Sequence, residues 1–211
     1  MEPDELRRYH ETAGTFRAAD TVPGLPGGVA GPGAGPGSEL GAGPGSELGA
    51  GPGSELGAGP LVPDALGFLH GRWRLERRLV DRVTGCSGTF AGTAQFAPLG
   101  GTAGAGAGGH GLAALTYHEH GELRFRGHRG PASRSLIFRG RPDGTADVCF
   151  ADGREFYRLD PRSGTWRGEH QCGADHYAVA GQVLGSGKFQ ERWLVRGPAK
   201  DYDIITTLVR A

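Results

Sequence analysis

The chain has 211 residues with 23 basic and 23 acidic side chains, so its formal net charge at pH 7 is zero. This balance does not indicate a nucleic-acid-binding protein, because such domains carry a marked excess of Lys and Arg. No apolar run approaches the roughly 20 residues of a membrane span, and the start, "MEPDELRRYHETAG", has no apolar signal core. We therefore expect a cytoplasmic protein with neither a nucleic-acid nor a membrane partner.

The two parts of the chain differ sharply in composition. Residues 1–60 hold 8 of the 14 prolines and 16 of the 41 glycines but 2 of the 17 aromatic residues, and their 3 basic and 8 acidic side chains give a charge of −5. Residues 61–211 hold the other 15 aromatics, and their 20 basic and 15 acidic side chains give +5. Only the second part has the apolar content for a sizeable core, so we expect one domain there.

An eight-residue unit, "GPGSELGA", occurs three times, at 35–42, 43–50 and 51–58. Each unit contains one leucine and a Gly-Pro-Gly, so it has too little apolar surface to stack as a repeat protein does. The composition is typical of a chain that stays solvated. We therefore expect residues 1–60 to form a disordered Gly/Pro-rich tail, and residues 61–211 to form the folded domain.

From residue 61 onward the pattern changes to the period of two that is typical of β-strands. In one segment Val148 and Phe150 alternate with Asp147 and Cys149. The Asp-Gly pairs in "PDGT" and "ADGR" and the glycines in "GSGK" predict tight hairpin turns. Candidate strands cover residues 72–82, 87–97, 112–120, 122–128, 133–141, 146–151, 154–160, 165–171, 176–184, 189–196 and 202–210.

So many consecutive strands without a long helix indicate an antiparallel meander. Such a meander most simply closes on itself, because closure removes exposed sheet edges. We therefore predict an all-β fold, a closed antiparallel up-and-down barrel of about ten strands. The segment "VPDALGFLHG" before the first strand is expected to make a short helical turn that plugs one end.

The first strand opens with "GRW" at 71–73, which resembles the Gly-x-Trp opening of the calycin superfamily, the lipocalins and their relatives. The resemblance implies that Trp73, introduced by Gly71, plugs the closed end of the barrel and that an arginine of the last strand packs across it. Arg210, in "ITTLVRA", is the matching candidate, and cation–π packing on the indole gives the pairing a physical reason.

A second resemblance covers nearly all of residues 64–211. The series "FLHGRW", "YHEHGEL", "VCFADGREFYRLD", "EHQCGADHYAV" and "WLVRGPAKDYDIITTLVR" is similar to an uncharacterised domain-of-unknown-function family, number 6314. That family has no assigned activity, so the resemblance implies no reaction.

An arginine shares the apolar face of the first strand. Arg77 has the same phase as Trp73 and Leu75, so it is expected to point inward, where an uncompensated charge is costly. Glu119, which is in phase with Tyr117 on a later strand, is one candidate partner. Two interpretations stay open: a structural Arg–Glu pair, or an arginine that holds the carboxylate or phosphate of a ligand.

The densest polar cluster is "HQCGADHY". His170 and Cys172 share one face of a strand, and Asp175 and Tyr177 follow a glycine turn. Their spacing matches none of the usual zinc patterns, so we expect no metal site. His170 could lower the pKa of the Cys172 thiol for catalysis, or these groups could simply fix a hairpin. His170 would also be the axial ligand if a haem were bound.

We expect a small-molecule binding barrel whose ligand is apolar or amphiphilic and has an anionic head. Lys200, in the "GPAKDY" turn, is expected to reach the barrel mouth. The alternatives are a small acid–base enzyme that uses the His170, Cys172, Asp175 and Tyr177 cluster, and a non-catalytic interaction module. The predicted ligand-binding residues are Arg77, Glu119, His170, Cys172, Asp175, Tyr177 and Lys200.

Overall fold

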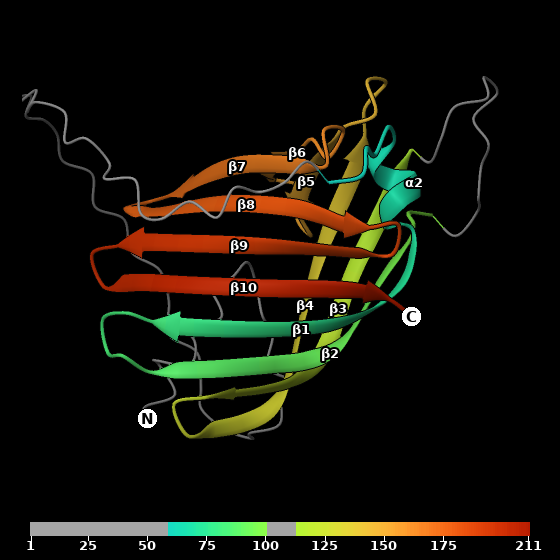
Figure 1. Cartoon of the computed structure of the whole chain (residues 1–211). Coiled ribbons are helices and arrows are strands. Elements are labelled where there is room, and N and C mark those ends of the chain that lie inside the picture. Colours follow the sequence, from blue (N-terminus) through green and yellow to red (C-terminus); the bar gives the residue numbers. More distant parts are fainter. Residues whose placement is uncertain (1–58, 101–112) are drawn as a thin grey trace, which may run out of the picture. The chain divides into compact units, whose positions relative to one another are not determined.

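The computed structural model describes residues 59–100 and 113–211, in which a short helix precedes ten antiparallel strands (Figure 1). The predicted tail, apart from its last two residues, lies outside these ranges. None of the helices in the described part is long and apolar enough to cross a membrane. The elements are α2 (Ala65–Leu69), β1 (Gly71–Asp81), β2 (Ser87–Pro98), β3 (Ala114–Phe125), β4 (His128–Gly140), β5 (Ala146–Phe150), β6 (Glu155–Leu159), β7 (Thr165–Cys172), β8 (Asp175–Gly185), β9 (Lys188–Gly197) and β10 (Lys200–Arg210).

The ten strands form one sheet in the order β6-β5-β4-β3-β2-β1-β10-β9-β8-β7. Pairing of the first strand with the last curls the meander round, with Trp73 opposite Arg210 and Arg77 opposite Thr206. The predicted all-β antiparallel barrel is confirmed. It is nearly closed, because β6 and β7 are the two ends of the hydrogen-bonded order. We call the junction between these two strands the seam.

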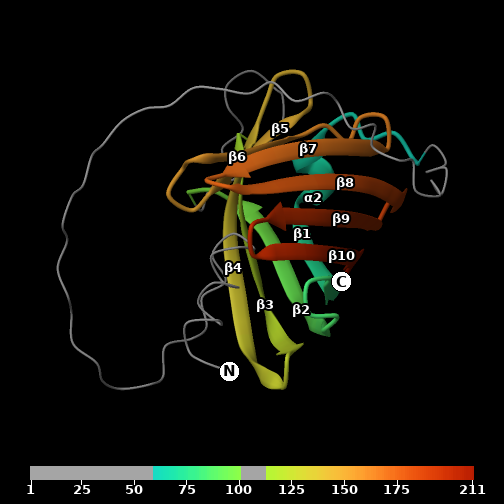
Figure 2. The same ribbon diagram turned by 90° about the vertical axis from the view of Figure 1, so that its left-hand side faces the viewer.

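The hairpin beside the seam is shorter than its neighbours (Figure 2). β5 and β6 have 5 residues each, whereas β3 and β4 have 12 and 13. β5 pairs with β4 only from Leu136 to Gly140. The other half of β4 therefore has no strand on that side within the described sheet.

The predicted break near residue 121 does not occur. The segments expected as strands 112–120 and 122–128 form one continuous strand, β3, and the turn falls at Arg126 and Gly127. Gly121 lies opposite Gly92 on β2, and a Cβ on Gly121 would stand 2.3 Å from the carbonyl oxygen of Ala91. The glycine therefore permits a close approach of two strands, which a turn signal read locally does not reveal.

Helix α2 lies across one end of the barrel (Figure 1). Asp64 caps it by accepting a hydrogen bond from the backbone N–H of Leu66, which is buried with Ala65 and Leu69. The indole of Trp73 is fully buried and donates to the carbonyl of Leu69 at 2.7 Å. This bond ties α2 to the start of β1.

Arg210 covers the outside of that junction. Its guanidinium lies 4.4 Å from the centroid of the Trp73 ring and donates to the backbone carbonyls of His70 and Phe68 at 2.8 and 2.5 Å. Gly71 has a φ of +122°, and a Cβ there would lie 3.1 Å from Nη1 of Arg210. The three residues expected to form the plug therefore lie together.

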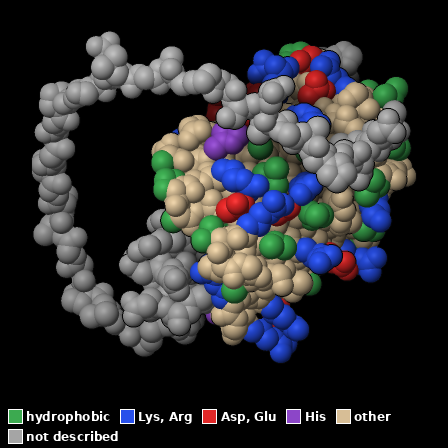
Figure 3. All heavy atoms as spheres, turned by 60° about the vertical axis from the view of Figure 1, so that its left-hand side comes forward, with side chains coloured by type: hydrophobic (Ala, Val, Ile, Leu, Met, Phe, Trp, Pro, Cys, Tyr) green, Lys and Arg blue, Asp and Glu red, His purple; other side chains and the backbone are tan. Residues whose placement is uncertain are grey.

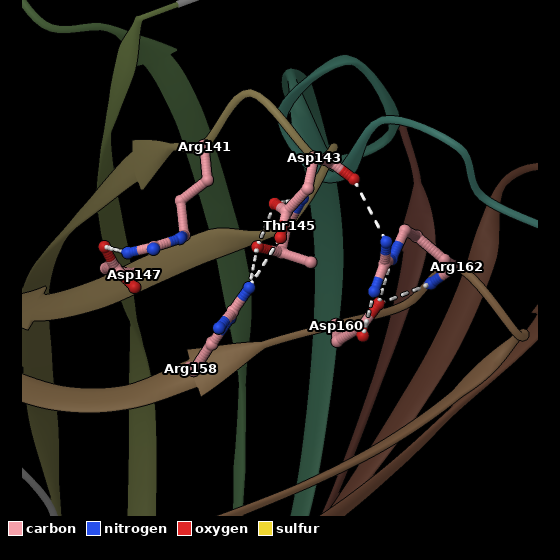
Figure 4. A network of polar contacts seen from close by, with 7 residues as sticks. All are labelled: Arg141, Asp143, Thr145, Asp147, Arg158, Asp160 and Arg162. Atoms are coloured by element: carbon pink, nitrogen blue, oxygen red, sulfur yellow. Dashed lines mark hydrogen bonds and ion pairs between the residues drawn. The ribbon is translucent and has the colours of Figure 1, made fainter.

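A polar network lies where α2 docks on the strands beside the seam (Figure 4). Asp143, in the β4–β5 turn, accepts from the Thr145 hydroxyl at 2.6 Å and from Arg158 of β6 at 2.6 Å. Arg162, in the loop that leads into β7, donates to the Asp143 carbonyl at 3.3 Å. The carbonyl of Gly144, in the same turn, accepts from the first backbone N–H of α2. The network therefore joins the β4–β5 turn, α2, β6 and the loop between β6 and β7.

Candidate functional site

Arg77 points inward, as its phase predicts, and is paired with Glu119. Its Nη1 and Nη2 donate to the two carboxylate oxygens of Glu119 at 2.8 and 2.9 Å, and its Nε donates to the hydroxyl of Thr206 at 2.8 Å. The side chains of Arg77 and Glu119 are 5% and 0% exposed. A fork-to-fork pair of this kind is the strongest geometry available to the two groups.

A second arginine joins this pair from β4. Arg134 donates to Oε2 of Glu119 at 3.3 Å, and the Tyr117 hydroxyl donates to the same oxygen. Burial alone would raise the pKa of Glu119, but Arg134 and Arg77 outweigh it and lower that pKa to about 2. Burial and the Glu119 charge together raise the pKa of Tyr117. We call Arg77, Glu119, Arg134, Tyr117 and Thr206 the ion cluster.

The sheet register brings the cluster together. Glu119 of β3 lies directly opposite Arg134 of β4. Arg77 lies on β1, so its side chain has to reach across β2 to contact Glu119. On β2, Phe90 lies opposite Arg77 and Ala94 lies opposite Glu119, with Gly92 between them. The Arg77 guanidinium lies 5.3 Å from the centroid of the Phe90 ring, and the small Gly92 and Ala94 leave room for the long arginine to reach Glu119.

Beside the ion cluster lies a cavity walled mainly by aromatic rings, which we call the chamber. Arg77, Tyr117, Arg134 and Thr206 form its polar side, and its rings include Phe96, Phe138, Phe156, Trp166, Phe189 and Trp193. The space open to the centre of a water molecule is about 30 Å³. Such a space admits a few water molecules and is far too small for a drug-sized ligand.

A second polar group faces the chamber from β9. The carboxylate of Glu191 accepts from the Tyr157 hydroxyl at 3.0 Å and from the Trp193 indole N–H at 3.4 Å. Burial and the Glu191 charge raise the pKa of Tyr157 well above its ordinary value. Tyr157 therefore stays protonated and acts as a donor toward Glu191.

The indole of Trp166 also lines the chamber. Trp166 is 6% exposed, and its N–H has no acceptor among the described residues. The ring lies directly against β8, where a Cβ on Gly181 would come within 1.9 Å of a ring carbon. The glycine thus makes room for the ring, which lines the chamber, and the ring edge that carries the unused N–H lies against Gly181.

The other predicted ligand-binding residues lie away from the chamber wall. Asp175 accepts from the Lys200 ammonium at 2.6 Å, which joins the β7–β8 turn to the β9–β10 turn. Cys172 is exposed, and Tyr177 is buried with its ring centroid 6.2 Å from that of His170. The structure therefore separates these groups from Glu119, which lies inside the ion cluster.

His170 packs across the seam. Its ring is edge-on to Phe150 and Phe156, at centroid distances of 5.5 and 5.2 Å. Burial lowers the pKa of His170, although a hydrogen bond with the backbone of Phe156 partly opposes the shift. Aromatic rings pack against this imidazole, and the neighbouring chamber is far too small for a haem, so the residues here do not fit one. Within the described ranges no group of three or more His, Cys, Asp or Glu side chains is placed to hold a metal ion.

Sequence reasoning missed three of the residues that shape the chamber. Glu191 has the same phase as Phe189 and Trp193, and Arg134 the same phase as Leu136, so strand alternation contained the signal for both. Trp166 is the buried residue of its own strand. Its unused donor could not be foreseen, because it depends on which acceptors other strands bring near it.

The model of the family described as "Family of unknown function (DUF6314)" matches residues 69–210. The chain belongs to this family. The matched range runs from the last residue of α2 to Arg210, so it contains the barrel and both residues of the Trp73–Arg210 contact. No curated protein matches the sequence.

Several solved structures are similar to the chain at low identity. An S-type phycobiliprotein lyase from Guillardia theta has 8% identity and a TM-score of 0.49, with 69% of this chain and 90% of that chain covered. A redesigned β-barrel, mFAP1, solved with DFHBI bound, has 15% identity and a TM-score of 0.35, with 69% and 98% covered. A DUF3598-family protein of unknown function from Nostoc punctiforme has 12% identity and a TM-score of 0.36, with 73% and 51% covered.

Proposed function

We propose that the barrel binds a small, largely apolar ligand in the chamber, and that the ligand carries an acidic or other hydrogen-bond-accepting head. The observation that supports this most directly is the Trp166 indole N–H, buried without an acceptor among the described residues. A buried donor left unused costs about 1–3 kcal/mol. A ligand that supplies an acceptor at this point would recover that cost.

The charges around the chamber favour a ligand whose head group binds at Trp166 and not at Arg77. Both terminal nitrogens of Arg77 already hold Glu119, so the expected anionic head cannot take Arg77 without displacing that carboxylate. Arg134 contacts Glu119 at the longer distance of 3.3 Å, and its charge is balanced by Glu191 on the same chamber wall. The two arginines and two glutamates sum to zero, so a hydrogen-bond-accepting head near Trp166 would lie in a chamber of no net charge.

Ligand entry requires the aromatic rings to move, since a drug-sized ligand needs a pocket of roughly 300–1,000 Å³. Phe156 of β6 stacks on Trp193 at a centroid distance of 5.0 Å and an interplanar angle of 6°. These rings lie next to the seam, where no ladder of backbone hydrogen bonds joins β6 to β7. Displacing them breaks ring contacts but no backbone pairing, so the seam is the least costly way in.

The test is a titration of the full chain with 1-anilinonaphthalene-8-sulfonate, a flat amphiphile with an anionic head, followed by tryptophan fluorescence and native mass spectrometry. We expect saturable 1:1 binding, with unchanged far-ultraviolet circular dichroism as the sign that the protein stays folded. Trp166→Phe keeps the ring but removes the donor, and should weaken binding about fivefold, which corresponds to one hydrogen bond.

Arg167→Ala is the matched control. Arg167 is the next residue of the same strand and faces outward, so its loss should leave the affinity unchanged. A titration without saturation in the folded protein would count against the proposal. So would equal binding by Trp166→Phe and the wild type, because the donor would then contribute nothing.

A further inference from the structure

A groove lies on the outer side of the barrel, where the β1–β2 and β3–β4 turns are found. It has about 440 Å³ of space, and its wall includes Arg78, Arg124, Arg126, Arg129 and the hydroxyl-bearing Thr89. No Asp or Glu is part of that wall as the structure describes it. Lys and Arg side chains also gather on the turn-bearing face of the molecule (Figure 3).

The sheet register arranges four of these residues in one row. Arg78 of β1 lies opposite Thr89 of β2, Thr89 opposite Arg124 of β3, and Arg124 opposite Arg129 of β4. Neighbouring strands lie about 4.8 Å apart, so Arg78 and Arg124 flank Thr89 at about 10 Å from one another. Two guanidinium arms therefore stand on either side of a hydroxyl, all on the outward face.

The carboxylates nearby neutralise only half of the charge. Arg126 is paired with the buried Asp81, while Arg124 and Arg129 share a single carboxylate, Glu122, at 2.7 and 2.8 Å. Arg78 makes no ion pair with any residue in the described ranges. Four guanidinium groups against two carboxylates leave the groove with a net charge of +2.

We propose that this groove binds the phosphate group of a small phosphomonoester. Such a group carries up to two negative charges at neutral pH, which balances the charge of the groove. Arg78 and Arg124 would each donate to phosphate oxygens from opposite sides, and guanidinium forks suit that geometry. Thr89 would donate its hydroxyl from the floor between them.

The groove favours a small phosphate over a nucleic acid. Proteins that bind single strands place several aromatic rings along a basic track, on which successive bases stack. In this groove the rings on the wall are those of Phe125 and His128, and Phe125 is a buried core residue. The site also lies on the opposite side of the sheet from the ion cluster, so it does not depend on the chamber binding a ligand.

The experiment is isothermal titration calorimetry of the full chain with phenyl phosphate at low, fixed ionic strength. We expect a saturable 1:1 isotherm. Arg78→Ala should weaken it by about tenfold or more, since it removes a charge-assisted hydrogen bond. Arg167→Ala, which removes an exposed arginine from β7, should bind as the wild type does. Far-ultraviolet circular dichroism and the melting temperature show whether each variant folds.

The other outcomes overturn the proposal. No saturation with phenyl phosphate, or the same loss of affinity in Arg78→Ala and Arg167→Ala, would reduce the groove to a non-specific basic surface. Retention on vesicles that contain phosphatidic acid, without binding of phenyl phosphate, would assign the groove to a lipid headgroup. Binding of polyuridylate with a steep salt dependence, again without phenyl phosphate binding, would assign it to a nucleic acid.

Discussion

Two glutamates in this barrel each contact two arginines, but one glutamate is buried and the other is exposed. Glu119 lies between Arg77 and Arg134 with its side chain 0% exposed, and Glu122 lies between Arg124 and Arg129 with its side chain 39% exposed. Water screens the second group and not the first. The ion cluster should therefore matter far more to stability than its surface counterpart.

Replacing each glutamate by glutamine tests this difference. Glu119→Gln removes the one carboxylate that both interior arginines contact, and should lower the free energy of unfolding by about 3–5 kcal/mol. Because the pKa of Glu119 is lowered to about 2, its stabilising effect is fully present above its ordinary pKa of about 4.3 and disappears as the pH falls toward 2. Urea unfolding at pH 6 and pH 3 measures both effects.

The expected pattern is that Glu119→Gln is much less stable than the wild type at pH 6 and that the gap narrows at pH 3. Glu122→Gln, the surface control, should change the unfolding midpoint far less at pH 6. Equal destabilisation by the two variants would show that the interior pair has no special weight.

At the scale of elements, the plug depends on a turn that lies far from it in sequence. Gly144, in the β4–β5 turn, has a φ of +82°, and a Cβ there would stand 2.0 Å from the carbonyl oxygen of Pro63, just before α2. The same turn accepts a hydrogen bond from Ala65 at 2.9 Å. The short helix is therefore held by its docking on the turn, since five residues cannot form a stable helix alone.

Gly144→Ala should displace the plug as well as strain the turn. Gly85→Ala is the matched control, because Gly85 has a similar φ of +71° and nothing within 4 Å of the added carbon. Both variants force an alanine into a positive φ, which costs roughly 1–2 kcal/mol. Thermal unfolding should show a clearly larger loss for Gly144→Ala, and a red shift in tryptophan emission should report exposure of Trp73. Equal melting temperatures would contradict the docking role.

The seam is the place in the whole barrel where the backbone is held by the fewest hydrogen bonds between strands. Eight of the ten strands have hydrogen-bonded neighbours on both sides, whereas β6 and β7 have one each. What joins these two strands is mainly side-chain contact, such as His170 against Phe156 at 5.2 Å. Local opening of a barrel begins where the fewest hydrogen bonds must break. Opening should therefore start at the seam.

Hydrogen–deuterium exchange of the full chain, read by mass spectrometry, checks this directly. Peptides from residues 155–159 and 165–172 should exchange roughly tenfold faster or more than peptides from 71–81 and 200–210, the two strands that close the sheet. Residues 175–185 are the internal control, because β8 is next to β7 but is paired on both sides. Uniform protection across all these peptides would mean that the barrel opens as one unit.

Local pattern in the sequence was enough for much of this fold. Period two indicated the strands, turn residues located most hairpins, and the phase of Arg77 with Trp73 placed it inside the barrel. These features depend on neighbouring residues alone, because side chains on a strand alternate between its faces. The break expected at Gly121 was wrong, because that glycine serves a strand partner and not a turn.

Only the tertiary structure decided which groups meet inside. Arg77 and Glu119 are 42 residues apart, and their contact depends on the register of three strands and on the small residues of β2 between them. The same holds for the seam, for the size of the chamber, and for the unused donor of Trp166. Each of these depends on pairings between distant strands, and such pairings arise from the packing of the whole barrel and not from any segment of it.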